Sequence, residues 1–324
     1  MSKLGSQVTL KFKNQTYHYD DANGLREINH HSSPRTFTSS GDSNPQKKTY
    51  LYCLNCNKMG HNHKNCRFPT NSYGNVFFKV GADGEVRYLM IQRKYTPAYV
   101  ELLRAKYFQA GVLNFDYLCL LIRDLPLTER HYLLSYDFPY LSQHLWRWEG
   151  TSEQLRCIYE ESDHCRQKFV QLKQGFQDPK EGLVQFKALF DRFPPPQIEP
   201  DWEFPKGHRM EGESDQQCAI RESREETTLD VSDYKMFLHV KPFQEKFTGI
   251  NQVRYCNSYY LSELTNPKKL LYYDPQQAEQ NREIRKIGWF TEAEVRLLVN
   301  NNHKHRLRML NEIVSLVSSL KKKN

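Results

Sequence analysis

The sequence lacks any run of about 18 apolar residues, so it predicts no membrane-spanning helix. Its first residues, MSKLGSQVTLKFKNQ, contain no apolar stretch of the kind that a secretory signal needs, and we expect no signal peptide. Eight cysteines among 324 residues are too few for the dense disulfide framework of a small secreted protein. These absences favour a reduced, intracellular setting in which cysteine can bind metal.

The composition allows a sizeable core and indicates a polyanionic partner. Apolar residues make up 38% of the chain and aromatic residues 13%, which is enough to build a core. A chain of 324 residues can hold one large domain or two smaller ones. The net charge of +8 and the pI of about 8.9 favour binding to a polyanion.

A segment of acidic residues at helical spacing carries the main chemical signal. Its glycine and charged positions are Gly207, Glu213, Arg221, Glu222, Glu225 and Glu226. A helix places the last three glutamates on one face, where they repel one another. A divalent cation with a preference for oxygen ligands, such as Mg²⁺ or Mn²⁺, removes that repulsion. Arg221 can hold a carboxylate through its planar fork, and Glu213 can turn back toward Arg221 or the metal. A solvated acidic helix face is the alternative interpretation.

This spacing resembles the Nudix hydrolase signature, G-x5-E-x7-R-E-U-x-E-E-x-G-U, at every charged position. We call residues 207–229 the Nudix box. Thr228 departs from the pattern, since the family has glycine there, at a position that often caps a helix. The resemblance implies metal-assisted cleavage of a diphosphate, with Mg²⁺ or Mn²⁺ held by the box glutamates and Glu213, close to Gly207.

A second motif, C-x2-C-x4-H-x4-C, comprises Cys53, Cys56, His61 and Cys66. Three thiolates and an imidazole suit a closed, tetrahedral structural Zn²⁺ site. The motif resembles a CCHC zinc knuckle, and such knuckles usually bind single-stranded nucleic acid. Leu54 stands where many of them carry an aromatic residue, so a purely structural or protein-binding knuckle is an alternative. Free cysteines beside a surface histidine are another.

The pattern along the chain predicts an α+β protein: an α/β/α Nudix sandwich with a mixed sheet, an inserted all-α subdomain and a small zinc knuckle. Helical periodicity over about 100 residues ahead of the box predicts the insert. The expected segments are a flexible polar segment at 1–49 with one strand at 8–12, the knuckle at 50–68, first Nudix strands at 69–96, the helical insert at 97–200, and the rest of the Nudix domain, ending in a basic helix, at 201–324.

Three further features narrow the resemblance. The box is entered through Trp202-Glu-Phe-Pro-Lys-Gly207, and a later segment, E-I-x-x-I-x-W-F, opens at Glu283. Together with the insert, they resemble the mRNA-decapping Nudix enzymes of large DNA viruses of the poxvirus, asfarvirus and mimivirus type, over about residues 73–320. The resemblance implies hydrolysis of the 5′ 7-methylguanosine cap to 7-methyl-GDP and RNA with a 5′-monophosphate. It also implies a catalytic role for Glu283, whose alternative is an exposed glutamate before a strand.

The predicted site follows from these patterns. Catalytic candidates are Arg221, Glu222, Glu226 and Glu283, with Glu222 or Glu283 as the base. A cationic methylated base favours aromatic faces, for which Tyr255 and Tyr259 are the candidates. The candidates for contacts with RNA are the basic residues Lys94, Arg104, Lys106, Lys206, Arg306 and Arg308.

Two other functions are compatible with the sequence. The same box serves a Nudix hydrolase of free nucleotides or diphosphoinositol polyphosphates, and a non-catalytic RNA-binding protein could retain a relic Nudix domain. The expected partners are capped mRNA and single-stranded RNA, with no membrane partner. We expect the protein in the cytoplasm of an infected host cell, and also in the virion.

Overall fold

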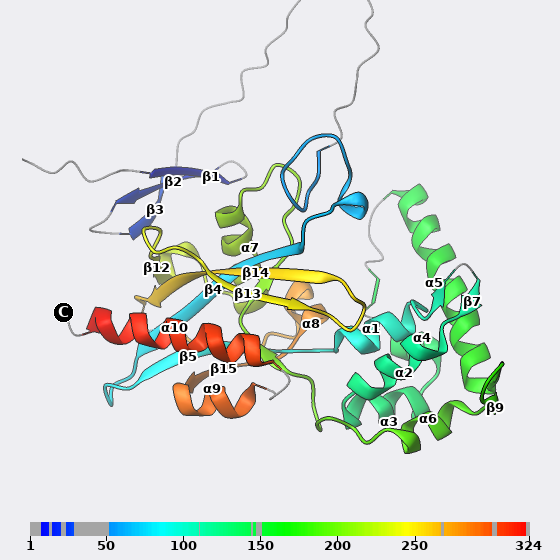
Figure 1. Cartoon of the computed structure of the whole chain (residues 1–324). Helices are drawn as coiled ribbons and strands as arrows, with labels where there is room; N and C mark the ends of the chain where they lie inside the picture. Colours follow the sequence, from blue (N-terminus) through cyan, green and yellow to red (C-terminus); the bar gives the residue numbers. More distant parts are fainter. Residues whose placement is uncertain are drawn as a thin grey trace, which may run out of the picture. The chain divides into compact units, whose positions relative to one another are not determined.

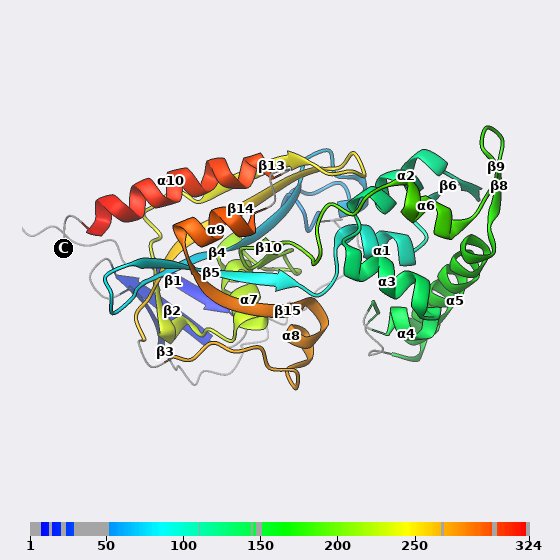
Figure 2. The same cartoon turned by 90° about the horizontal axis from the view of Figure 1, so that it is seen from below.

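The computed structural model describes residues 8–12, 15–20, 24–28, 52–109, 111–143, 145–146, 151–266, 269–299 and 303–321, the first three ranges as backbone (Figures 1 and 2). Two compact units share these residues. The first unit draws on Met1–Ile91, Phe204–Tyr272 and Ile287–Asn324, and the second on Gln92–Glu203 and Tyr273–Lys286. In this described part of the chain, no helix has the length and apolar character that crossing a bilayer requires.

A mixed sheet forms the centre of the first unit. Its strands are β4 (Thr70–Val80), β5 (Val86–Arg93), β10 (Trp202–Glu203), β11 (Lys206–Gly207), β12 (Tyr234–Met236), β13 (Phe243–Thr248), β14 (Arg254–Leu264) and β15 (Ile284–Thr291). β4 runs parallel to β14 and antiparallel to β5. The other pairs are β11 with β4, β12 and β13 with β14, and β15 with β5. β4 and β5 form an antiparallel pair within residues 69–96, where the first Nudix strands are expected, and β13 pairs antiparallel with β14.

Helices cover both faces of this sheet (Figure 2). The helices of the first unit are α7 (Asp215–Thr227), α9 (Glu292–Leu298) and α10 (Lys304–Lys321), with 3₁₀ turns η1 (His63–Asn65) and η2 (Val231–Asp233). β4 is buried continuously from Ser72 to Phe78, as expected of a strand covered on both faces. Phe77, Ile220 and Leu229 join the core between α7 and the sheet.

A buried polar network fixes α7 on the sheet. The Asn75 side chain donates to Ser223 Oγ at 2.7 Å and to the Ala219 carbonyl at 3.0 Å. Its own oxygen accepts from Ser262 Oγ at 2.9 Å. All three side chains are fully buried. Because each polar group has a hydrogen-bond partner, burying them costs little free energy. The network therefore sets the position of α7 along β4 and β14.

The N-terminal segment contains more structure than the sequence analysis expects. Besides β1 (Val8–Phe12), it has β2 (Gln15–Asp20) and β3 (Gly24–Ile28), and the three form an antiparallel sheet in the order β1-β2-β3. The expectation of a flexible segment with a single strand is therefore wrong for residues 15–20 and 24–28. Residues 29–49, which complete this segment, lie outside the described part of the chain.

The second unit is mainly helical. Its helices are α1 (Pro97–Leu103), α2 (Phe115–Asp124), α3 (Leu127–Ser135), α4 (Phe138–Ser142), α5 (Ser152–Gln174), α6 (Phe186–Arg192) and α8 (Ala278–Glu283). Local signals set their starts: the Thr96 hydroxyl accepts from Tyr99 N ahead of Pro97, and Thr151 and Gln154 form a capping box on α5.

The second unit is not purely α-helical, however. Its additional strands are β6 (Phe108–Gln109), β7 (Val112–Leu113), β8 (Phe176–Asp178) and β9 (Gly182–Val184). β6 pairs with β7, and β8 with β9, as two small hairpins. The α+β class with a mixed sheet and an extra helical region is confirmed, whereas the expectation of an all-α insert is corrected by these hairpins.

Candidate active site

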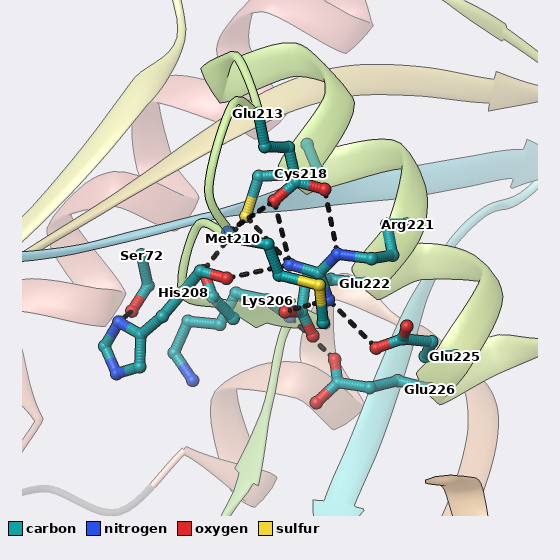
Figure 3. A network of polar contacts seen from close by, with 12 residues as sticks. Ser72, Lys206, His208, Met210, Glu213, Cys218, Arg221, Glu222, Glu225 and Glu226 are labelled. Carbon is teal, nitrogen blue, oxygen red and sulfur yellow. Dashed lines mark hydrogen bonds and ion pairs between the residues drawn. The ribbon is translucent and has the colours of Figure 1, made fainter. Parts of the chain in front are cut away.

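Helix α7 presents the box glutamates as the spacing predicts. Ser214 begins the helix with a capping box, in which its hydroxyl accepts from Gln217 N and the Gln217 side chain accepts from Ser214 N. Glu222, Glu225 and Glu226 follow on one side of α7 (Figure 3). Glu222 and Glu226 are buried and Glu225 is half-buried. The sequence therefore places three carboxylates in a sparsely hydrated position, where charge is costly unless it is paired.

The C-terminus of α7 is strained at Thr228. This residue adopts φ 62° and ψ 8°, the left-handed conformation that glycine occupies without strain. We expect Thr228→Gly to raise the free energy of unfolding by about 1 kcal/mol, because a β-branched residue is disfavoured there. Chemical denaturation of the two proteins measures the gain. An unchanged or lower stability of the glycine variant would contradict this account of the cap.

Arg221 is the centre of the carboxylate cluster (Figure 3). Its Nε and Nη2 donate to the two oxygens of Glu213 at 2.8 and 3.0 Å. Its Nη1 donates to Glu222 at 2.6 Å and to Glu225 at 2.9 Å, and Nη2 also donates to the His208 carbonyl at 2.8 Å. A lysine has neither the number nor the geometry of donors to hold three carboxylates in this way.

The positive charge of Arg221 is retained inside this cluster. Burial alone would lower the pKa of Arg221, but the hydrogen bond with Glu213 and the nearby charges of Glu222 and Glu213 raise it above its ordinary value. Arg221 therefore stays protonated beside the carboxylates of Glu213, Glu222 and Glu225. Carboxylate oxygens are the donors that Mg²⁺ and Mn²⁺ prefer.

Removing Arg221 should be costly in stability. We expect Arg221→Met to lower the free energy of unfolding by roughly 3–5 kcal/mol, because buried Glu213 loses its partner. Arg224→Met is the matched control: it lies on the same helix with a side chain 62% exposed and contacts Asp230 only at 3.7 Å. Its loss should stay below about 1 kcal/mol. Equal losses in chemical denaturation would show that the fork of Arg221 is not a structural element.

Strand β11 completes the cluster from the opposite side. The backbone N–H of Lys206 donates to Glu226 Oε2 at 2.7 Å, which fixes that carboxylate. A Cβ on Gly207 would overlap the carboxyl group of Glu222, so only glycine leaves room for it. The glycine is thus required by the close approach of the Glu222 carboxyl group. Glu222 comes 15 positions later, which is why the sequence alone does not reveal this contact.

The cysteines and histidine of the second motif also come together. Within the described part of the chain, the four ligand atoms of Cys53, Cys56, His61 and Cys66 form a group in which all lie within 4.8 Å of one another. Cys56 Sγ and His61 Nε2 are 3.4 Å apart, close to the roughly 3.6 Å that a tetrahedral Zn²⁺ with ordinary bond lengths requires. Although burial acts to raise it, hydrogen bonds with Asn55 and His61 lower the pKa of Cys66 to about 6. The donor set fits a metal ion.

The knuckle is attached directly to the loop of the box. Asn55 lies between two of the cysteines, and its backbone carbonyl accepts a hydrogen bond from Arg209 Nη2 at 2.6 Å. Its side-chain oxygen accepts a hydrogen bond from the backbone N–H of Asn71, at the start of β4, at 2.7 Å. Arg209 also pairs with Asp215, the first residue of α7, at 2.9 Å. The Arg209 side chain is 4% exposed. The sequence analysis missed Asn55 and Arg209, because their partners lie far away in the sequence.

A family comparison decides the nature of the carboxylate cluster. The model of the NUDIX domain matches residues 177–311 of this chain, which include the whole box and β14. Residues 177–311 of the chain therefore resemble a NUDIX domain. The Nudix helix is α7, and the presence of all the charged residues of the Nudix box supports a Nudix pyrophosphohydrolase.

Viral proteins are similar to this chain over most of its length. A protein of Acanthamoeba polyphaga mimivirus, whose name assigns it provisionally to mRNA decapping, is 26% identical over 247 residues. That alignment covers 70% of this chain and 64% of the relative, slightly less than two thirds of the relative's length. The mRNA-decapping protein g5R of African swine fever virus is 26% identical over 220 residues, covering 66% of this chain and 81% of the relative.

Solved Nudix structures resemble the chain weakly. A C. elegans Ap4A hydrolase binary complex aligns with a TM-score of 0.39 and 12% identity, covering 77% of this chain and 98% of that one. RenU, a Nudix hydrolase from M. smegmatis, aligns with a TM-score of 0.34 and 10% identity, covering 76% of this chain and 86% of the other.

Two predicted ligand-binding residues are instead part of the core. Tyr259, predicted to stack on the cap, has 0% of its surface exposed, and its hydroxyl donates to Glu245 at 3.2 Å. Arg306, predicted to contact RNA, is 5% exposed, and its Nε donates to the same carboxylate at 2.9 Å. Both predictions are wrong in the same way, because these polar groups satisfy a buried glutamate between β13, β14 and α10. Tyr255 is half-buried and stacks on Phe247, and its role at the cap stays a prediction.

The other predicted basic residues vary in exposure. Lys106 and Arg308 are exposed, and Lys206 is half-buried beside the carboxylate cluster. Lys94 donates through Nζ to the Asn281 carbonyl at 2.8 Å, and Arg104 donates through Nη2 to the Leu145 carbonyl at 2.8 Å. Their contacts with RNA stay predictions.

Glu283 ends α8, directly before β15, and belongs to the second unit. Its carboxylate pairs with Arg282, and its carbonyl accepts from Lys94 N at 2.8 Å. With Arg93, Tyr95 and Arg104 it lines a hollow of about 440 Å³ in the second unit. The predicted catalytic role of Glu283 stays a prediction.

The buried Glu245 makes stability depend on pH. Burial would raise the pKa of Glu245, yet the Arg306 guanidinium and hydrogen bonds with His305 and Asn257 hold it far below its ordinary value. A carboxyl whose folded pKa is depressed stabilises the fold above its unfolded pKa of about 4.3, and this stabilisation is lost as the pH falls below it. We expect Glu245→Gln to cost roughly 3 kcal/mol near neutral pH and progressively less in acid.

The measurement is the free energy of unfolding of both proteins between neutral and acidic pH. Glu312→Gln, an exposed position on α10, is the control and should leave the profile unchanged. A difference between wild type and Glu245→Gln that stays constant or widens in acid would refute the ion pair as its cause.

Proposed function

We propose that this protein is a metal-dependent mRNA-decapping hydrolase. It cleaves the 5′ 7-methylguanosine cap and releases 7-methyl-GDP and RNA with a 5′-monophosphate. The observation that carries the hydrolytic part is the cluster in which Glu213, Glu222 and Glu225 pair with Arg221, while the Lys206 N–H holds Glu226. A relic domain without activity would have no need of so many buried, mutually repelling carboxylates.

The donor sets support two kinds of metal ion. Glu222, Glu225 and Glu226 would hold Mg²⁺ or Mn²⁺. The Zn²⁺ ion would be held by Cys53, Cys56, His61 and Cys66. When bound at the glutamates, Mg²⁺ or Mn²⁺ neutralises phosphate charge and lowers the pKa of a water molecule. The knuckle ligands form a closed set with a structural role.

The chain's own groups position the reaction. Arg221 orients Glu222 and Glu225 by donating to both, and the Lys206 N–H orients Glu226. Glu222 is the base candidate within the cluster, and the hydrogen bond from Arg221 fixes the position of its carboxylate. Glu283, in the second unit, is the alternative base.

The choice of capped RNA as substrate has separate support. The mimivirus and African swine fever virus relatives are named for mRNA decapping. The Cys3His group is of a type that commonly binds single-stranded RNA, and the net charge of +8 suits a polyanion. We also propose that the protein acts in the cytoplasm of an infected host cell, where such transcripts are translated.

An assay with cap-labelled RNA tests the proposal. The full-length protein is incubated with RNA whose cap carries a radioactive phosphate, in the presence of Mg²⁺ or Mn²⁺. Release of labelled 7-methyl-GDP that depends on the cation supports decapping. Turnover of free dinucleotides or diphosphoinositol polyphosphates without turnover of capped RNA would overturn the substrate. Binding of RNA without any hydrolysis would overturn the enzymatic function itself.

A further inference from the structure

A groove of about 720 Å³ lies where the knuckle meets the Nudix sheet. Residues of the knuckle line one side, and residues of β13, β14 and the start of α7 line the other, all within the first unit. Pockets that hold a nucleotide-sized ligand commonly have volumes of roughly 300–1,000 Å³. The knuckle and the Nudix domain thus share one surface hollow that neither builds alone.

The groove carries positive charge. Lys58, from the knuckle, and Lys246, from β13, both line it and are exposed. Asp215 is the acidic residue of the lining, and Arg209 neutralises it through the ion pair at 2.9 Å. Two cations from separate structural elements therefore remain to face a ligand, and a phosphodiester backbone is the complementary partner.

Aromatic and amide groups accompany these cations. Phe68 lines the groove with 48% of its surface exposed, and Lys58 Nζ lies over one face of its ring, 4.3 Å from the centre. An exposed ring is a platform for an unstacked base, and an exposed lysine can turn from that ring to a phosphate when a base stacks there. Asn57 and Gln244 are exposed in the same lining and can donate to and accept from base edges.

We propose that this groove binds a single-stranded segment of RNA, one or two nucleotides long, with Phe68 stacking on a base and Lys58 and Lys246 contacting phosphates. The inference rests on the proposed function, and it assigns a binding site to the RNA chain that carries the cap. Phe68 here takes the part of the aromatic residue that is missing at Leu54. A base-paired duplex does not fit, because its bases cannot stack on a protein ring.

Binding of uncapped, fluorescently labelled single-stranded RNA to the full-length, zinc-loaded protein tests the proposal. Lys58→Glu with Lys246→Glu should weaken binding by about tenfold or more and reduce the salt dependence, with a change of slope of roughly 1.4 for two phosphate contacts. Matched controls are Lys64→Glu, on the knuckle, and Lys241→Glu, ahead of β13, both exposed and both outside the groove. These controls should change affinity by less than about twofold.

Two further measurements sharpen the result. Phe68→Leu should weaken binding about fivefold or more, and Phe68→Trp should restore it, since every base stacks on an aromatic face. Zinc content is measured for every variant. If Lys58→Glu lowers the zinc content, the single variant Lys246→Glu, on β13, takes the place of the double variant. Equal losses in the groove and control variants, or equal competition by duplex RNA, would overturn the groove as the site.

The outcome is separable from that of decapping, because the RNA in this experiment has no cap and binding is read without hydrolysis. If cap release fails while the groove variants still lose affinity selectively, the proposed function falls and the RNA site stands. If cap release occurs while the groove and control variants bind alike, the RNA site falls and the proposed function stands.

Discussion

Glu226→Gln is expected to lower the rate of hydrolysis by about a thousandfold, because it removes a charge from the site where Mg²⁺ or Mn²⁺ would bind, a loss worth several kcal/mol in the transition state. The amide oxygen can still accept from the Lys206 N–H, which now contacts Glu226 Oε2 at 2.7 Å. The variant should therefore fold normally. Rates are measured with capped RNA at saturating Mg²⁺ or Mn²⁺, and stability by thermal unfolding.

Glu211→Gln is the matched control for this experiment. Glu211 lies in the same loop of the Nudix box but is exposed, so its replacement should change the rate by less than about twofold. A Glu226→Gln enzyme within about tenfold of the wild-type rate would show that this carboxylate is not required, and the ligand assignment on α7 would be wrong.

Loss of the knuckle metal is expected to impair hydrolysis even of a small substrate that makes no contact with the groove. Cys56→Ser should unfold the knuckle, since so short a segment has little core of its own. Asn55 then no longer holds Arg209 at 2.6 Å, and Arg209 no longer fixes the start of α7 through Asp215. A displacement of about 1 Å in a catalytic group can cost about a hundredfold in rate, so we expect a loss of at least about tenfold.

The measurement is hydrolysis of a cap dinucleotide, with the rate and the zinc content determined on the same preparation. Cys157→Ser is the control, since this cysteine is exposed on α5 and belongs to neither site. A zinc-free variant that cleaves the dinucleotide at the wild-type rate would show that the knuckle acts independently of the Nudix loop.

Sequence reasoning succeeded where the determinant of structure is local. The positions of Glu222, Glu225 and Glu226 follow from helical periodicity, and the capping box at Ser214 follows from a four-residue pattern. The cysteine spacing likewise brings four ligands together within 14 residues, from Cys53 to Cys66. In each case the residues that decide the geometry are close in the sequence.

Sequence reasoning failed where burial depends on distant partners. Alternation along β14 shows that Tyr259 and Tyr260 face opposite sides, but both sides of this strand are covered. Tyr259 and Arg306 are buried because Glu245, on another strand, needs partners, and nothing near either residue in the sequence indicates it. Residues 15–20 are a different case. Their sequence, QTYHYD, alternates as a strand does, so local periodicity is enough to predict β2.

The fork of Arg221 has a consequence for how the protein would respond to metal starvation. Because Arg221 already pairs with Glu213, Glu222 and Glu225, the Nudix helix does not depend on a bound cation for its fold. An Mg²⁺ or Mn²⁺ ion held by the glutamates would therefore be able to leave and rebind without unfolding the helix. The knuckle has no such internal cation among its four ligands. One chain would therefore hold an exchangeable metal ion at the glutamates and a permanent one in the knuckle. A chelator would then inhibit hydrolysis in two phases. Loss of the first ion would be fast and reversible, and loss of the second would be slow and accompanied by unfolding of the knuckle.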